Sequence, residues 1–242
     1  METDNKNLTA LKVGFYSSWS LTILTLITFG FAMIAIPPSG PNCPMNCMDY
    51  PYTDLLSYFP RDYYWMYLAI FQLCAFVIFM IANHFVAPVE KKIFSSISVA
   101  FTLISATVLL SNYFLQFSVV PISVIKGQTE GIPLLTQYNG HGIFIVLEEL
   151  GFTMMTIAFI FLSPIFSMKN RLEKTIHWLL VIPFGVNLLA FIYYSIQFGL
   201  DRDYRFETAA IGINWSMTLL IGILAGVFFK RKINKITSVM TG

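Results

Sequence analysis

Two adjacent glutamates, Glu148 and Glu149, lie in the middle of a long apolar run and are the residues of this chain best suited to chemistry. Residues 131–147 and 150–168 on either side contain no Asp, Glu, Lys or Arg. A carboxylate at membrane depth costs roughly 2.5–3.5 kcal/mol, so it usually faces a protein interior or a wet cavity. A buried carboxyl group can also bind or move a proton. Because neighbours on a helix differ by about 100°, we expect the two glutamates to face different surroundings.

Polar side chains on other apolar segments are expected at a similar depth. His141 stands seven residues before Glu148 and lies above it if the helix starts that early. Most of these residues lie toward one side of the membrane, which predicts a hydrated pocket open outward and closed toward the cytoplasm. The candidate ligand-binding residues are Glu148, Glu149, His141, Asn112, Gln116, Asn214, Gln197, Tyr194 and Gln72. The alternative for the uncharged ones is helix packing, since such groups also bridge membrane helices by weak hydrogen bonds. Packing is the role expected for Ser18, Thr22 and Thr25.

Composition predicts a single all-α domain that crosses a membrane several times. The chain of 242 residues is 56% hydrophobic and 12% charged, whereas soluble domains average about 25% charged residues. Its net charge of +2 is too small to indicate nucleic-acid binding. Six segments are long enough to span the bilayer core of about 30 Å. They are 13–36, 63–86, 93–117, 142–166, 176–200 and 208–229, and only the fourth contains a formal charge.

The distribution of Lys and Arg predicts a bundle with both termini in the cytoplasm of a cell-membrane protein. The predicted cytoplasmic cations are Lys6, Lys12, Lys91, Lys92, Lys169, Arg171, Lys174, Lys230, Arg231, Lys232 and Lys235, against Arg61, Lys126, Arg202 and Arg205 outside. This divides the chain into a tail (1–12), a membrane domain (13–229) and a basic tail (230–242). The first apolar run is too long for a signal peptide, so we read it as a retained helix.

Cysteines and histidines offer few sites for a metal or cofactor. Cys43 and Cys47 could form a small disulfide, stay free, or supply half of a metal site. Every lysine lies outside the predicted spans, which argues against a retinal Schiff base. His84 and His177 share a depth near the cytoplasmic face, and haem ligation between them is a minor alternative. No cofactor is therefore assigned.

The string from Glu148 to Thr153 resembles the paired-glutamate motif of CAAX-prenyl-protease-like membrane proteins. That motif places an arginine where this chain has Thr153, and it is followed by metal-binding histidines, whereas only His177 follows here. The resemblance covers two residues, and that activity is not carried over.

The expected function is binding of a small molecule, a lipid headgroup or a cation in a pocket around Glu148 and Glu149, by a transporter or sensor. One alternative is a membrane-embedded hydrolase or transferase that uses Glu148, Glu149 and His141. Another is a non-catalytic subunit of a membrane complex. Membrane lipid is an expected partner, and no protein partner is indicated.

Overall fold

The computed structural model describes residues 2–35, 39–41, 43, 45 and 47–241. This part of the chain is helical and contains no strand. Six of its helices are long and apolar enough to cross a membrane, which confirms the predicted class. The long helices are α1 (Glu2–Ile34), α2 (Tyr64–Val86), α3 (Lys92–Ser118), α6 (Ile143–Leu162), α7 (Arg171–Phe198) and α8 (Tyr204–Thr241). The short ones are α4 (Val120–Ile125), α5 (Ile132–Leu135), η1 (Thr53–Tyr58), η2 (Arg61–Tyr63), η3 (Val89–Lys91) and η4 (Ser163–Ile165).

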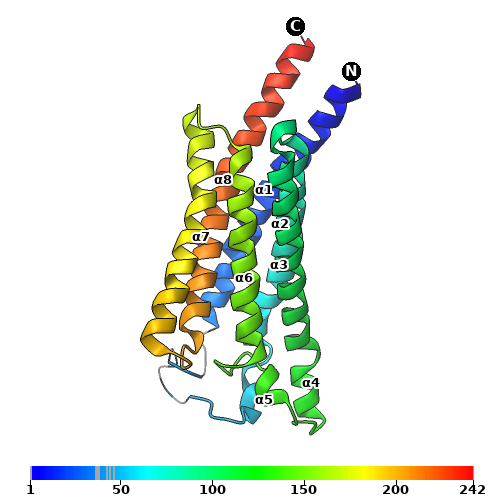
Figure 1. Ribbon diagram of the computed structural model, residues 1–242. Helices are drawn as coiled ribbons and strands as arrows, with labels where there is room; N and C mark the ends of the chain where they lie inside the picture. Colours follow the sequence, from blue (N-terminus) through cyan, green and yellow to red (C-terminus); the bar gives the residue numbers. More distant parts are fainter. Residues whose placement is uncertain (1, 36–38, 42, 44, 46, 242) are drawn as a thin grey trace.

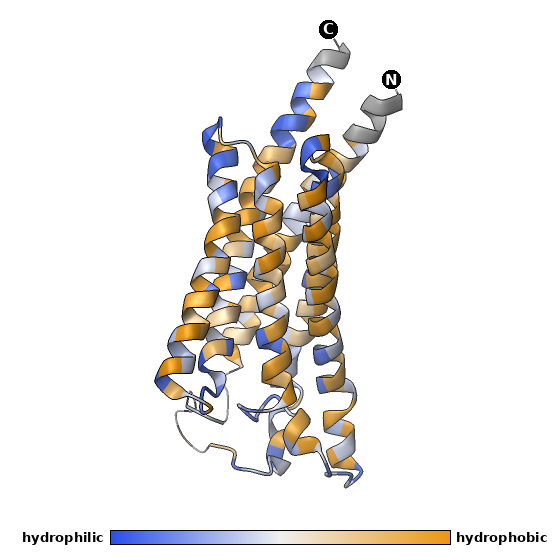
Figure 2. Ribbon diagram, viewed as in Figure 1, coloured by the Kyte–Doolittle hydropathy of each residue, from blue (hydrophilic) through white to orange (hydrophobic). Residues whose placement is uncertain are grey.

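The long helices run roughly parallel to one bundle axis, and both termini lie at the same end (Figure 1). We call this the tail end, and the opposite end, which carries α4 and α5, the loop end. Hydrophobic residues cover the middle of the bundle, and hydrophilic ones gather at its two ends (Figure 2). Helix α1 begins at Glu2 within the predicted N-terminal tail, and α8 continues to Thr241 through the predicted basic tail.

Small residues bring α1 and α8 close together near the tail end. Gly222 and Gly226 of α8 form a GxxxG pair, a pattern that lets membrane helices approach closely. A Cβ atom on Gly222 would collide with the Thr22 hydroxyl and lie 3.1 Å from the carbonyl oxygen of Ser18. Ser18 and Thr22 are buried in this contact, as expected from the sequence.

A ladder of three hydrogen bonds fixes α3 against α6. Each bond runs from a polar side chain of α3 to a main-chain oxygen of α6, and successive bonds are seven residues apart on both helices. The pairs are Ser98 with Ala158 at 2.8 Å, Ser105 with Gly151 at 2.8 Å, and Asn112 with Phe144 at 2.9 Å. Seven residues are nearly two helical turns, so the ladder follows one face of each antiparallel helix. It sets the register that brings Tyr113 next to Glu148.

We expect Gly222→Leu to lower the thermal unfolding temperature of the detergent-solubilised protein. The added side chain has no space between α8 and α1, and overpacking of this kind typically costs about 1–3 kcal/mol. Gly185→Leu is the matched control, because a Cβ atom on Gly185 of α7 meets nothing within 4 Å. Equal unfolding temperatures for the two variants would contradict the close α1–α8 contact.

Candidate functional site

Glu148 lies in the centre of the bundle and contacts two other helices. Its side chain is 0% exposed. The Tyr113 hydroxyl of α3 donates to Glu148 Oε1 at 2.8 Å, and Glu207 of α8 is the neighbouring acid. An ionised carboxylate only accepts hydrogen bonds, so two of them can bond only when a proton lies between their oxygens. Glu148 and Glu207 are therefore neighbouring acids that a hydrogen bond can join only when the pair holds one proton.

Glu207 also lines a cavity of about 450 Å³ between α1, α2, α6 and α8 near the loop end, which we call the aromatic pocket. Six aromatic side chains line it: Phe29, Trp65, Tyr138, Phe144, Tyr204 and Trp215. Trp65 and Trp215 meet edge to face, with ring centroids 6.0 Å apart. The pocket thus combines aromatic walls with an acidic group.

The described residues that line the aromatic pocket include two acids and no Lys, Arg or His. Asp62 is one of the acids, and Arg61 Nε neutralises it at 2.6 Å. The Tyr138 hydroxyl donates to Asp62 at 3.3 Å. Burial raises the pKa of Tyr138, so its hydroxyl stays protonated and remains a donor. Among the described residues, Glu207 accepts a hydrogen bond from the neutral hydroxyl of Thr208, at 3.2 Å, and lies beside Glu148.

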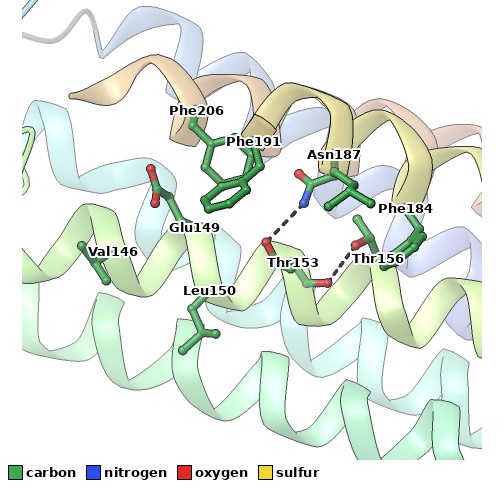
Figure 3. Close-up of a pocket in the computed structure, with 10 residues that line it drawn as sticks. Val146, Glu149, Leu150, Thr153, Thr156, Phe184, Asn187, Phe191 and Phe206 are labelled. Carbon is green, nitrogen blue, oxygen red and sulfur yellow. Dashed lines mark hydrogen bonds between the residues drawn. The ribbon is translucent and has the colours of Figure 1, made fainter. Parts of the chain in front are cut away.

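Glu149 faces a different part of the bundle, as its position one residue along the helix predicts. Arg202, in the turn between α7 and α8, pairs with Glu149 Oε2 at 2.9 Å. The Arg202 guanidinium also lies over the rings of Phe191 and Phe206, 4.9 and 5.8 Å from their centroids. Figure 3 shows Glu149 beside these two rings. The charge of Glu149 is thus already balanced.

A groove of about 390 Å³ between α6 and α7 continues from Glu149 toward the middle of the bundle. Its polar groups bond to one another: Asn187 donates to the Thr153 hydroxyl at 3.2 Å, and Thr156 donates to the Thr153 carbonyl at 2.8 Å (Figure 3). The remaining lining is aliphatic or aromatic. The two adjacent glutamates therefore belong to two different cavities.

The other predicted ligand residues are not gathered around the glutamates. Asn112 is part of the α3–α6 ladder, and Gln116 bonds to the main chain of Leu135 and Gln137. Asn214 donates to the Ala210 carbonyl of its own helix at 2.9 Å. Gln72 is buried within the bundle on α2. On α7, Gln197 is exposed and Tyr194 is partly exposed.

His141 does not lie above Glu148, because the condition for that geometry is not met. Helix α6 begins at Ile143, and Gly142 before it has extended backbone angles (φ −78°, ψ 168°). His141 therefore precedes the helix, where it is exposed. Its acidic neighbour is Asp203, whose charge it stabilises.

The sequence pattern missed three groups that define the site: Glu207, Tyr113 and the Trp65–Trp215 pair. The sequence prediction leaves Glu207 in a turn, because it starts the sixth span at residue 208. Helix α8 starts at Tyr204 instead, which places Glu207 inside the bundle. Its spacing of seven residues from Asn214 is the signal that could have identified it, since that spacing puts both on one helical face.

Cys43 and Cys47 are joined by a disulfide, with their Cα atoms 5.9 Å apart. Within the described ranges of the chain, no group of three or more His, Cys, Asp or Glu side chains is arranged to hold a metal ion. The disulfide thus closes a small covalent ring in the segment between α1 and η1.

Asp203 closes the α7–α8 turn beside the site. Its backbone is left-handed (φ 53°), and its carboxylate occupies the space where a side chain on Gly140 would stand. Burial raises the pKa of Asp203, and the nearby His141 partly opposes the shift. Asp203 is therefore harder to ionise in the folded protein than in the unfolded chain.

We expect Asp203→Asn to raise the unfolding temperature at neutral pH, because Asn tolerates the left-handed backbone and carries no charge to bury. A raised pKa in the folded state means that wild-type stability falls as the pH rises through that pKa. The gain should disappear below about pH 4, where both states of the wild type are protonated. Unfolding temperatures measured across this range check the prediction, and a gain independent of pH would contradict it.

We expect Tyr113→Phe to destabilise the protein, because it leaves Glu148 Oε1 buried without its donor. The loss of a partner for a buried polar group costs about 1–3 kcal/mol. Tyr193→Phe on α7 is the control, since Tyr193 is 60% exposed. Thermal unfolding of both variants in detergent measures the difference, and equal stability would contradict the Tyr113–Glu148 bond.

Comparison with known proteins identifies no relative. No family model matches the chain, and no significant match was found among curated proteins or solved structures.

Proposed function

We propose that this chain is a multi-pass protein of the cell membrane, with both termini in the cytoplasm, that binds an organic cation in the aromatic pocket as a transporter or sensor. The observation that carries the proposal is Glu207, a nearly buried acid that faces a cavity of about 450 Å³ without a basic partner. Glu148, which is fully buried and does not line the cavity, is its neighbour in the bundle interior. Negative charge in such a place is best matched by a cationic ligand.

The walls of the pocket favour an organic cation over a metal ion. Cations are attracted to the faces of aromatic rings, most strongly to Trp, and this attraction grows when water is excluded. A volume of about 450 Å³ lies within the range of small-molecule sites, about 300–1,000 Å³. A bare metal ion needs several oxygen ligands at short range, whereas most of the lining here is aromatic or aliphatic.

The charges at the two ends support a pocket on the outer side of the membrane. The cations of the α2–α3 and α6–α7 connections and of the C-terminal part of α8 lie at the tail end, as expected for a cytoplasmic face. Two of the four cations at the loop end, Arg61 and Arg202, are neutralised by Asp62 and Glu149. The aromatic pocket lies near the loop end, so its ligand enters from outside the cell.

Binding of tetraphenylphosphonium to the purified protein, followed by calorimetry, tests the proposal. Saturable binding is expected for the wild type, with a loss of at least about tenfold in affinity for Glu207→Gln because the acid no longer balances the ligand's charge. Tetraphenylborate, an anion of the same shape, measures non-specific partitioning and should show no saturable site. Equal affinity for wild type and Glu207→Gln would overturn the assignment.

Gly212→Leu provides a steric test that leaves every acidic group in place. Gly212 lines the pocket, and a Cβ atom there meets nothing within 4 Å, so a leucine enters the cavity without a backbone clash. We expect binding to be lost while the unfolding temperature is kept. Gly185→Leu, an equivalent change on α7, should bind as the wild type does. Retained binding by Gly212→Leu would place the ligand elsewhere.

A further inference from the structure

The Glu148–Glu207 pair differs from the other two buried acids near the loop end in how its charge is balanced. Asp62 and Glu149 each contact an arginine, at 2.6 and 2.9 Å. Glu148 and Glu207 contact each other and neutral hydroxyl groups. Oε2 of Glu148 has no hydrogen-bond partner within the described side chains, and Glu207 is the neighbouring acid. One proton held by the two acids would take the place of the missing cation.

The two members of the pair differ in their access to the aromatic pocket. Glu148 is 0% exposed, whereas Glu207 is 8% exposed and lines the cavity. A ligand in the pocket can therefore touch Glu207, but it reaches Glu148 only through Glu207. The shared proton lies between the group that meets the ligand and the group enclosed behind it.

The titratable and charged groups around the pair come from several elements. Helix α3 contributes Tyr113, which donates a hydrogen bond to Glu148. Helix α8 contributes Tyr204, which interacts electrostatically with Glu207. From α6 comes Glu149, which Arg202 of the α7–α8 turn neutralises. The segment before α2 contributes Asp62 with Arg61, and the part of α1 that lines the pocket is uncharged. None of these groups supplies an unbalanced positive charge that could replace the proton.

We infer that an organic cation entering the aromatic pocket displaces the proton shared by Glu148 and Glu207, so that binding exchanges one positive charge for another. This inference rests on the function proposed above and adds the ion that leaves. A cation beside Glu207 favours the ionised form of both carboxyl groups. The O–H bond of the pair breaks, the electron pair stays on the carboxylate, and the proton passes to water through the pocket. The pair changes from one negative charge to two, and the ligand balances the second.

Such an exchange makes cation binding depend on pH. Above the range in which the pair holds its proton, both acids are ionised and the ligand binds without competition. Within that range, the affinity rises by up to about tenfold for each unit of pH, because one proton leaves for each cation bound. The two acids titrate as a unit, so the range belongs to the pair and not to either residue.

Calorimetry in two buffers of different ionisation enthalpy measures the proton released when tetraphenylphosphonium binds. This probe carries no titratable proton, so any proton that appears comes from the protein. We expect the wild type to release up to one proton per bound ion, with the affinity increasing from acidic to neutral pH. Binding without proton release at every pH would overturn the inference and leave the proposed function standing. Absence of saturable binding would overturn both.

The variant Glu148→Gln tests the released proton independently of cation binding, because it removes the proton of the pair and keeps Glu207 in the aromatic pocket. The side-chain amide that this substitution introduces can donate to Glu207 in place of the shared proton and cannot leave. We expect this variant to bind tetraphenylphosphonium, to release no proton, and to lose the pH dependence of its affinity. Glu149→Gln is the matched control on the adjacent residue, which pairs with Arg202, and it should release protons as the wild type does. Proton release by Glu148→Gln equal to that of the wild type would contradict the role of the pair.

Discussion

The α3–α6 ladder is the contact on which the rest of the site depends. Membrane helices gain little from apolar burial against each other, because lipid is as apolar as the helix surface, so polar contacts and close packing set their register. Here three side chains of α3 bond to carbonyl oxygens of α6 at intervals of seven residues. A shift of one residue would break all three bonds. The same register places Tyr113 against Glu148, which then meets Glu207 from α8.

Two neighbouring residues of one helix show how surroundings assign different roles to the same side chain. Glu149 meets an arginine held between two phenylalanine rings, so its charge is structural. Glu148 accepts a hydrogen bond from a tyrosine and lies beside a second acid. The rotation of about 100° between adjacent helical residues is enough to place one acid in an ion pair and the other beside a second acid.

Much of the fold could be predicted from the sequence, because the apolar segments are long and nearly free of charge. The start of α2 at Tyr64 and of α3 at Lys92 each lie within one residue of the predicted limits. The site was harder to predict. Glu148 and Glu149 stand out because charges in an apolar run are rare, but Glu207 lies in a charged stretch where nothing distinguishes it locally. Asn112 and Gln116 were predicted to bind ligand, yet both bond to main-chain groups, and no local pattern distinguishes the two uses.

The glycines of α8 have two different structural roles: two of them allow close packing against α1, and one borders the aromatic pocket. Gly222 and Gly226 touch α1, whereas Gly212, about 15 Å nearer the loop end, borders open space in the aromatic pocket. Helices α1 and α8 are therefore tightly apposed near one end and leave a hollow toward the other. A side chain added at Gly212 would change the size of the cavity without disturbing the contact between α1 and α8. The shape of the cavity can thus diverge among descendants of the same scaffold while its stability is conserved.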